Sequence, residues 1–131
     1  MKLFLASANN TLNLISSYLP NNGKGVADIT RAVRADKIIY SGTSAGSMIA
    51  SSDLSLCSFD DDEKKYVEGK KDFSGIGFVN FLIIPHTNNK DFIKSNTQMI
   101  EHLADNPQTL IFINDNQAVW VNDKKFEILS I

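Results

Sequence analysis

The sequence is poor in the residues that mark disulfide-rich, metal-binding and polyanion-binding proteins. Cys57 is the only cysteine among 131 residues, so an internal disulfide is excluded and a reducing, cytoplasmic setting is expected. Two histidines and one cysteine form no ligand cluster, and no glycine-rich phosphate loop is present, so we expect neither metal nor cofactor. Lysine and arginine number 13 against 15 acidic residues, a net charge of −2 that argues against a nucleic-acid partner.

Long hydrophobic runs are also lacking. The longest, residues 78–85, is interrupted by Asn80 and is far shorter than the roughly 18 residues that span a membrane. Residues 3–6 are apolar and precede a signal-peptidase-like Ala6-Ser7-Ala8, but the stretch is too short for a secretion signal. We therefore expect neither a membrane segment nor export.

The composition fits one globular domain covering residues 1–131. The chain is 43% hydrophobic and 21% charged, and its 3 prolines and 7 glycines mark the ends of elements rather than a linker. No internal repeat or low-complexity tract divides it.

Hydrophobic periodicity predicts alternating strands and helices. The expected strands are residues 2–6, 37–41, 78–84 and 109–113, and the expected helices are residues 11–18, 26–35, 45–50 and 91–104. Residues 118–121 and 125–129 are expected to form a closing hairpin, and residues 51–71 an irregular surface segment. Because the strands are apolar without alternation, we expect a three-layer α/β/α fold with a mostly parallel sheet, residues 37–41 being a central strand.

One helix carries two further expectations. In residues 91–104, Ile93, Thr97, Ile100 and Ala104 align along one face, which we expect to be buried. His102 lies on the opposite face, so we expect it to be exposed and without a catalytic role.

The segment Gly42-Thr43-Ser44-Ala45-Gly46 has the Gly-x-Ser-x-Gly pattern of a nucleophile elbow. It lies directly between an expected strand and an expected helix, and the two glycines let neighbouring backbone pass the sharp turn. The Ser44 hydroxyl is then presented at a helix N-terminus, where free N–H groups favour developing negative charge. The pattern predicts that Ser44 is a nucleophile.

An activated serine needs a base and an acid that orients it. His86 follows Pro85 at the carboxyl end of an expected buried strand, so it is the candidate base. Asp115 follows the strand at residues 109–113 and projects from the same edge of the sheet. Asp60 or Asp61, in the loop after the elbow, are the alternative acids.

The residues now described resemble those of the dipeptidase E (aspartyl dipeptidase) family of serine peptidases, to which cyanophycinases are related. The resemblance covers residues 38–131 nearly continuously, through GTSAGSMIAS, GFVNFLIIPHTNN and INDNQAVWV, and the opening MKLFLAS resembles the family's first strand. It implies that Ser44 is the nucleophile, His86 the base and Asp115 the acid, although some family assignments favour a loop acid, here Asp60 or Asp61.

The resemblance also implies a reaction and a substrate class. A Ser-His-Asp triad would hydrolyse short peptides, including dipeptides with an N-terminal Asp, through an acyl-enzyme, with the Ala45 N–H stabilising the oxyanion. Gly42, Thr43 and Asn88 are expected to line the substrate site. The only arginines, Arg31 and Arg34, precede the elbow strand, so no arginine is dedicated to a substrate carboxylate.

The chain departs from the family pattern before the elbow. Family members carry further strands there and a Gly-Gly-Asn turn whose N–H completes the oxyanion hole, whereas this chain lacks such strands between about residues 26 and 36. Asn9-Asn10-Thr11 is the nearest substitute for the turn. Loss of one oxyanion donor typically lowers turnover by ~10²–10³.

That departure motivates an alternative function and a hypothesis about a partner. The alternative is a catalytically impaired, shortened family member that acts as a binding or assembly module. An esterase of the α/β-hydrolase type fits the elbow, but its order of nucleophile, acid and histidine would require Asp60 as the acid. Sheet edges left by missing strands make a homodimer a further hypothesis.

Overall fold

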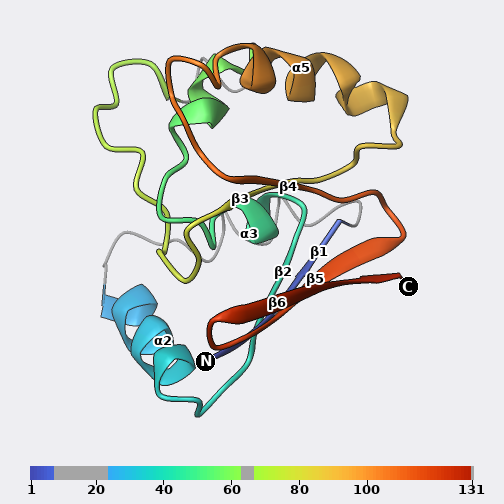
Figure 1. Cartoon of the computed structure of the whole chain (residues 1–131). Coiled ribbons are helices and arrows are strands. Elements are labelled where there is room, and N and C mark those ends of the chain that lie inside the picture. Colours follow the sequence, from blue (N-terminus) through green and yellow to red (C-terminus); the bar gives the residue numbers. More distant parts are fainter. Residues whose placement is uncertain (8–23, 63–66, 131) are drawn as a thin grey trace.

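The computed structural model describes residues 1–7, 24–62 and 67–130, which form a mixed α/β fold (Figure 1). In chain order the elements are β1 Lys2–Ala6, α2 Lys24–Arg34, β2 Tyr40–Thr43, α3 Ala45–Met48, η1 Ser55–Phe59, β3 Leu82–Ile84, η2 Lys90–Phe92, α5 Ile93–Glu101, β4 Leu110–Phe112, β5 Gln117–Asn122 and β6 Lys125–Ser130. The helix expected at residues 11–18 lies outside the described residues.

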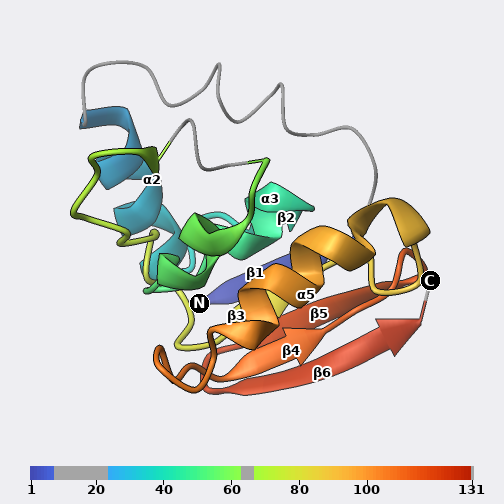
Figure 2. The same cartoon turned by 90° about the horizontal axis from the view of Figure 1, so that it is seen from above.

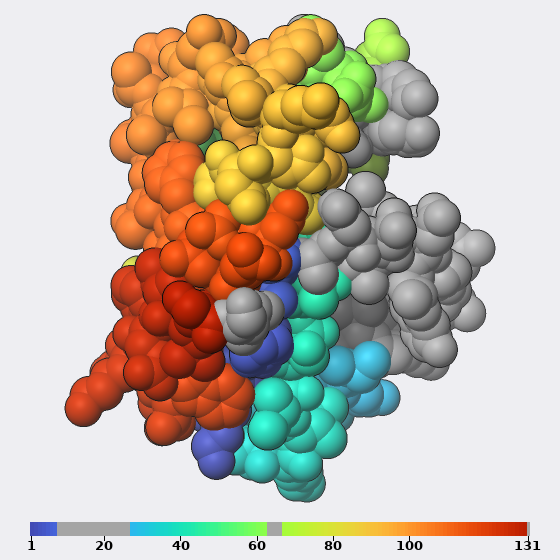
Figure 3. Space-filling view, turned by 90° about the vertical axis from the view of Figure 1, so that its right-hand side faces the viewer, coloured from blue at the N-terminus to red at the C-terminus, as the bar shows by residue number. Residues whose placement is uncertain are grey.

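The strands form a four-stranded sheet of order β2-β1-β5-β6 and a two-stranded sheet of β3 and β4. Figure 3 shows blue β1 between the red C-terminal strands and the blue-green segment that contains β2. β1 pairs in parallel with β2, and β3 in parallel with β4, whereas β5 is antiparallel to both β1 and β6. The expected C-terminal hairpin is thus confirmed. The expected parallel pairing holds for β1 with β2 and for β3 with β4, but not for the pairs that involve β5.

β2 is not the central buried strand expected at residues 37–41. It begins at Tyr40 and lies at the edge of its sheet, while Ile38 and Ile39 before it are 45% and 57% exposed. The turn that ends α2 occupies the preceding residues, because the N–H of Lys37 donates to the carbonyl of Ala32 at 2.9 Å. The prediction of a core strand at residues 37–41 is therefore wrong, because the β-branched Ile38 and Ile39 are exposed residues before an edge strand.

The buried residues form two clusters that meet at β3. Ile83 belongs to the larger cluster, together with Leu3 and Leu5 of β1, whereas Leu82 and Ile84 belong to the smaller cluster with Met99 of α5. β3 is therefore buried on both faces, which explains its unbroken apolar sequence. In Figures 1 and 2, α5 lies over β3 and β4.

The orientation expected for the helix at residues 91–104 was wrong. Ile93 and Ile100 are 58% and 39% exposed, and the buried residue of α5 is Met99. His102 is half-buried rather than exposed, with its ring stacked on Phe59 at a centroid distance of 3.8 Å. The inward face of α5 includes Ser95 and Asn96, which line a cavity. Because both are polar, hydrophobic periodicity does not predict that they face inward.

No helix within the described part of the chain is long and apolar enough to cross a membrane.

Candidate active site

The elbow places Ser44 on a tight turn between β2 and α3. Ser44 has φ 49° and ψ −122°, a backbone conformation that is costly for a residue with a side chain. A Cβ added to Gly42 would lie 2.4 Å from the carbonyl oxygen of Gly46, so only glycine fits there. The expected strand–serine–helix arrangement is what the structure shows.

Two hydrogen bonds anchor this turn. The N–H of Ser44 donates to the carbonyl of Ala6 at 2.9 Å, which fixes the elbow against the end of β1. The Tyr40 hydroxyl donates to the carbonyl of Gly46 at 2.7 Å, and burial raises the pKa of Tyr40 to about 12. At neutral pH Tyr40 is therefore a hydrogen-bond donor that ties β2 to α3.

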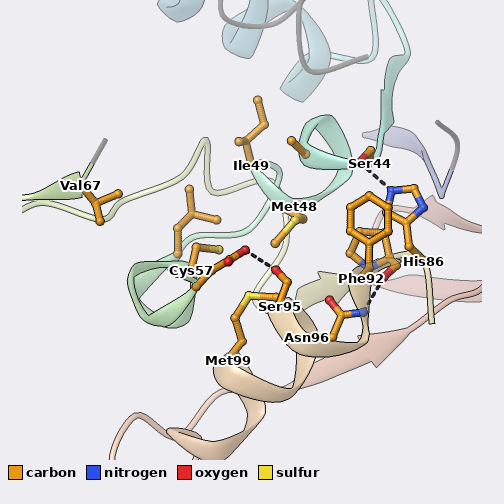
Figure 4. Close-up of a pocket in the computed structure, with 14 residues that line it drawn as sticks. Ser44, Met48, Ile49, Cys57, Val67, His86, Phe92, Ser95, Asn96 and Met99 are labelled. Atoms are coloured by element: carbon orange, nitrogen blue, oxygen red, sulfur yellow. Dashed lines mark hydrogen bonds between the residues drawn. The ribbon is translucent and has the colours of Figure 1, made fainter. Parts of the chain in front are cut away.

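His86 follows β3 and faces Ser44. Its Nε2 lies 2.8 Å from the Ser44 Oγ, and the histidine is only 1% exposed (Figure 4). Its φ of 60° turns the chain back toward the elbow directly after Pro85. The side chain of Asn96 donates to the carbonyl of Pro85 at 3.0 Å, so α5 fixes the segment that carries the histidine.

Asp115 lies behind His86, in the loop between β4 and β5. Its Oδ1 is 2.6 Å from the Nδ1 of His86. The exposed Asn88 accepts the backbone N–H of Asp115 at 3.0 Å and so holds this loop. A carboxylate at Nδ1 favours the tautomer with the proton on Nδ1, which leaves Nε2 free to accept the Ser44 proton.

The environment of Asp115 keeps it ionised. Burial by itself raises the pKa of the carboxyl, but the hydrogen bonds from His86 and Ser7 outweigh this and hold the pKa below its usual 3.8. Asp115 is therefore negatively charged across the neutral range and stabilises a proton on the imidazole.

Ser7, at the end of β1, is a site residue that the sequence analysis missed. Its fully buried hydroxyl accepts the backbone N–H of His86 at 2.8 Å and donates to Oδ1 of Asp115 at 2.8 Å. It also lies 3.2 Å from the Nδ1 of His86. Its position as a polar residue at the carboxyl end of a strand was the available signal, the same one that identified His86 and Asp115.

The alternative acids do not contact the histidine in the structure. Asp60 accepts a hydrogen bond from the hydroxyl of Ser95, and Asp61 lies 3.1 Å from the ammonium of Lys94. Both loop carboxylates are thus engaged with α5. Among the three candidates, only Asp115 hydrogen-bonds His86.

The expected oxyanion donor, Ala45, is the first residue of α3 and lines the same cavity as Ser44 and His86. Within the described ranges, the structure assigns no acceptor to its N–H. Asn9-Asn10-Thr11, the sequence's substitute for a second donor, lies outside the described residues. Gly42, Thr43 and Asn88 do not line this cavity, and Gly42 and Asn88 instead shape the elbow and hold the Asp115 loop.

A cavity of about 230 Å³ opens beside Ser44 (Figure 4). Phe92 forms part of its wall and stacks on His86 with a centroid distance of 4.2 Å, so it restrains the imidazole ring. The described residues offer no group of three or more His, Cys, Asp or Glu side chains that could hold a metal ion. A serine, a base and an orienting carboxylate beside a cavity can perform acyl transfer.

Comparisons with known proteins gave one family match and a structural likeness. Residues 10–129 match the model of peptidase family S51. A solved structure of a protein assigned as a peptidase E, from Listeria monocytogenes EGD-e, has a similar fold with a TM-score of 0.67, over 99% of this chain and 98% of that chain. The two sequences are 16% identical, so this likeness shows the fold alone.

No curated protein matches the sequence significantly. The family model nevertheless spans all but the two ends of the chain, including the elbow, His86 and Asp115. The chain therefore belongs to peptidase family S51, the family of dipeptidase E.

Proposed function

We propose that the protein is a serine-type peptidase that hydrolyses short peptides with Ser44 as nucleophile, His86 as general base and Asp115 as orienting acid. The observation that carries the proposal is the continuous hydrogen-bonded chain among them. Ser44 Oγ lies 2.8 Å from His86 Nε2, and His86 Nδ1 lies 2.6 Å from Asp115 Oδ1. These distances lie in the range required for proton transfer between nucleophile and base.

The reaction begins when Nε2 of His86 takes the hydroxyl proton of Ser44. The Oγ then forms a bond to the peptide carbonyl carbon, and the N–H of Ala45 donates to the resulting oxyanion. His86 returns the proton to the leaving amine as the C–N bond breaks, which leaves an acyl-enzyme. Water, deprotonated by the same imidazole, attacks the ester and releases Ser44.

Asp115 acts through the histidine. Its carboxylate keeps the proton on Nδ1 and stabilises the imidazolium that forms during attack. The burial of Ser44 and His86, at 7% and 1% exposure, limits competing water and strengthens these interactions.

Family membership supports a peptidase, and the resemblance to dipeptidase E makes dipeptides the first substrates to test, those with an N-terminal Asp among them. The purified protein is incubated with dipeptides that differ in their first residue, and the released amino acids are measured. Ser44→Ala should lower turnover by at least ~10³, the scale of losing a triad member. Ser52→Ala, which removes an exposed hydroxyl outside the site, should match wild type.

The shortened-module alternative predicts a different result in the same assay. A folded wild-type protein that releases no amino acid from any dipeptide would contradict the peptidase proposal. Turnover that persists unchanged in Ser44→Ala would show that another group carries the reaction.

A further inference from the structure

The cavity beside Ser44 has walls that are mostly apolar. The apolar side chains come from α3 and the following residue, from η1 and its neighbour Leu54, from the loop before β3, from the residue after β3, and from η2 and α5: Ala45, Met48, Ile49, Leu54, Cys57, Val67, Pro85, Phe92 and Met99. In Figure 4, Cys57 and Met99 lie on the side of the cavity away from His86, and Met48 lies between them and His86. A group held at Ser44 can therefore extend along sulfur and hydrocarbon surface.

Among the described residues that line this wall, Asp60 carries the only carboxyl group, and His86 is the only other side chain that can carry a charge. Its Oδ1 accepts the N–H of Asp62 at 3.0 Å, and its Oδ2 accepts the hydroxyl of Ser95. Within the described residues no lysine or arginine lines the cavity or pairs with Asp60. The part of the lining that the structure describes is therefore mostly apolar and contains one carboxyl group and no lysine or arginine.

Both arginines and Lys94 of α5 have partners outside the cavity. Arg31 pairs with Asp28 at 2.9 Å, and Arg34 donates to the carbonyl of Gly77 at 3.1 Å. Lys94 is 73% exposed and lies 3.1 Å from Asp61. Both arginines of the sequence thus lie on α2, outside the cavity.

We propose that this cavity selects a neutral, apolar side chain, such as that of leucine or methionine, on the acyl residue of the substrate, and that Asp60 rejects an acidic one. The inference rests on the proposed function. It makes an apolar residue, rather than aspartate, the preferred acyl residue of the substrate. An apolar side chain releases water from the methionine and leucine walls, which favours binding. A carboxylate would lose its hydration opposite Asp60 without gaining a cation from the described lining residues, which disfavours binding.

The kinetic test compares kcat/KM for Leu-Leu, Met-Leu, Lys-Leu and Asp-Leu. We expect the leucine or methionine dipeptide to exceed Asp-Leu by at least tenfold, on the scale of hydrophobic pocket discrimination. Asp60→Asn keeps the shape of the side chain and removes its charge. It should therefore lower the ratio of kcat/KM for Leu-Leu to kcat/KM for Asp-Leu. Asp61→Asn removes the same charge one residue away, outside the cavity lining, and should leave that ratio as in wild type.

The outcomes separate this inference from the proposed function. Turnover led by Asp-Leu, and lost in Ser44→Ala, would overturn the pocket proposal while the peptidase assignment stands. Turnover led by Lys-Leu would overturn it in favour of a cation-selecting site. If no dipeptide is cleaved, calorimetric binding to Ser44→Ala decides: tighter binding of Leu-Leu than of Asp-Leu supports the pocket, and the reverse contradicts it.

Discussion

Ser7 joins two members of the site that come from distant parts of the chain. One buried hydroxyl accepts the His86 N–H and donates to the Asp115 carboxylate. It thereby fixes the backbone of the base and one oxygen of the acid in a single arrangement. We assign Ser7 a positioning role, since it contacts both partners of the nucleophile but not the nucleophile.

Replacing Ser7 tests this role. Ser7→Ala should lower kcat by about tenfold with little change in KM, because the hydroxyl orients His86 and Asp115 rather than substrate. The same variant should raise the pKa of Asp115, since one of the hydrogen bonds that lowers it is lost. Carboxyl NMR titration measures that shift, and Ser58→Ala, which removes a hydroxyl that donates to the carbonyl of Ser55, is the control.

An unchanged Asp115 pKa together with unchanged kcat in Ser7→Ala would contradict the positioning role. A loss of stability alone, with kcat and the pKa unaltered, would assign Ser7 to packing.

Asp115→Asn should lower kcat by ~10³–10⁴, because a neutral amide no longer holds the Nδ1–H tautomer or the imidazolium. Its effect on stability should depend on pH. The folded pKa of Asp115 lies below the usual 3.8, so its ionised form stabilises the native state fully above 3.8, and this contribution is lost as the pH falls through the lowered value.

Denaturant unfolding of wild type and Asp115→Asn from pH 7 to pH 2 measures this contribution. The difference in the free energy of unfolding should be constant near neutrality and shrink in acid. A difference that grows as the pH falls would contradict the lowered pKa.

At the scale of elements, the elbow depends on the close approach of β2 and α3. Gly42→Ala would push a Cβ against the carbonyl of Gly46, so the turn must open and Ser44 must move from His86. We expect destabilisation of about 1–3 kcal/mol, the usual cost of overpacking, and loss of most turnover.

Gly69→Ala provides the matched control for that change. Gly69 has φ 77°, and a Cβ added there has no described atom within 4 Å, so alanine meets strain without a clash and should cost only about 1–2 kcal/mol, with turnover retained. Thermal unfolding and dipeptide turnover, measured on both variants, compare the two effects. Wild-type turnover in Gly42→Ala would contradict the tight packing of the elbow.

The sequence predicted those parts of the site whose residue types carry local signals. The elbow motif defined Ser44, and polar residues directly after apolar strands identified His86 and Asp115. The inward side of α5 escaped prediction because Ser95 and Asn96, which line the cavity, are polar, while the exposed Ile93 and Ile100 are apolar. Hydrophobic periodicity does not distinguish a helix that faces a core from one that faces a cavity.

At the scale of the whole molecule, strand pairing brings the residues of the candidate site together. β1 and β2 run in parallel, so Ser7 and Ser44 emerge at one edge, and the parallel pair β3 and β4 delivers His86 and Asp115. Hydrogen bonds then connect the two sheets at this edge: Ser44 bonds His86, and Ser7 bonds both His86 and Asp115. The candidate active site is therefore also a junction between the sheets.

Strand order was the part of the fold that local sequence did not specify. Strands alternating with helices indicate parallel pairing, but the C-terminal hairpin adds antiparallel strands next to β1. The edge position of β2 likewise depends on which strands pair with one another, and the sequence around Ile38 and Ile39 does not predict that position. Such choices depend on long-range contacts rather than on the residues of one segment.

The most direct test of the central claim is intact-protein mass spectrometry after exposure to a fluorophosphonate. The account predicts one adduct, mapped by proteolysis to Ser44, absent in Ser44→Ala, much slower in His86→Ala and unchanged in Ser52→Ala. Labelling that survives Ser44→Ala, or no labelling of the folded wild-type protein, would contradict it.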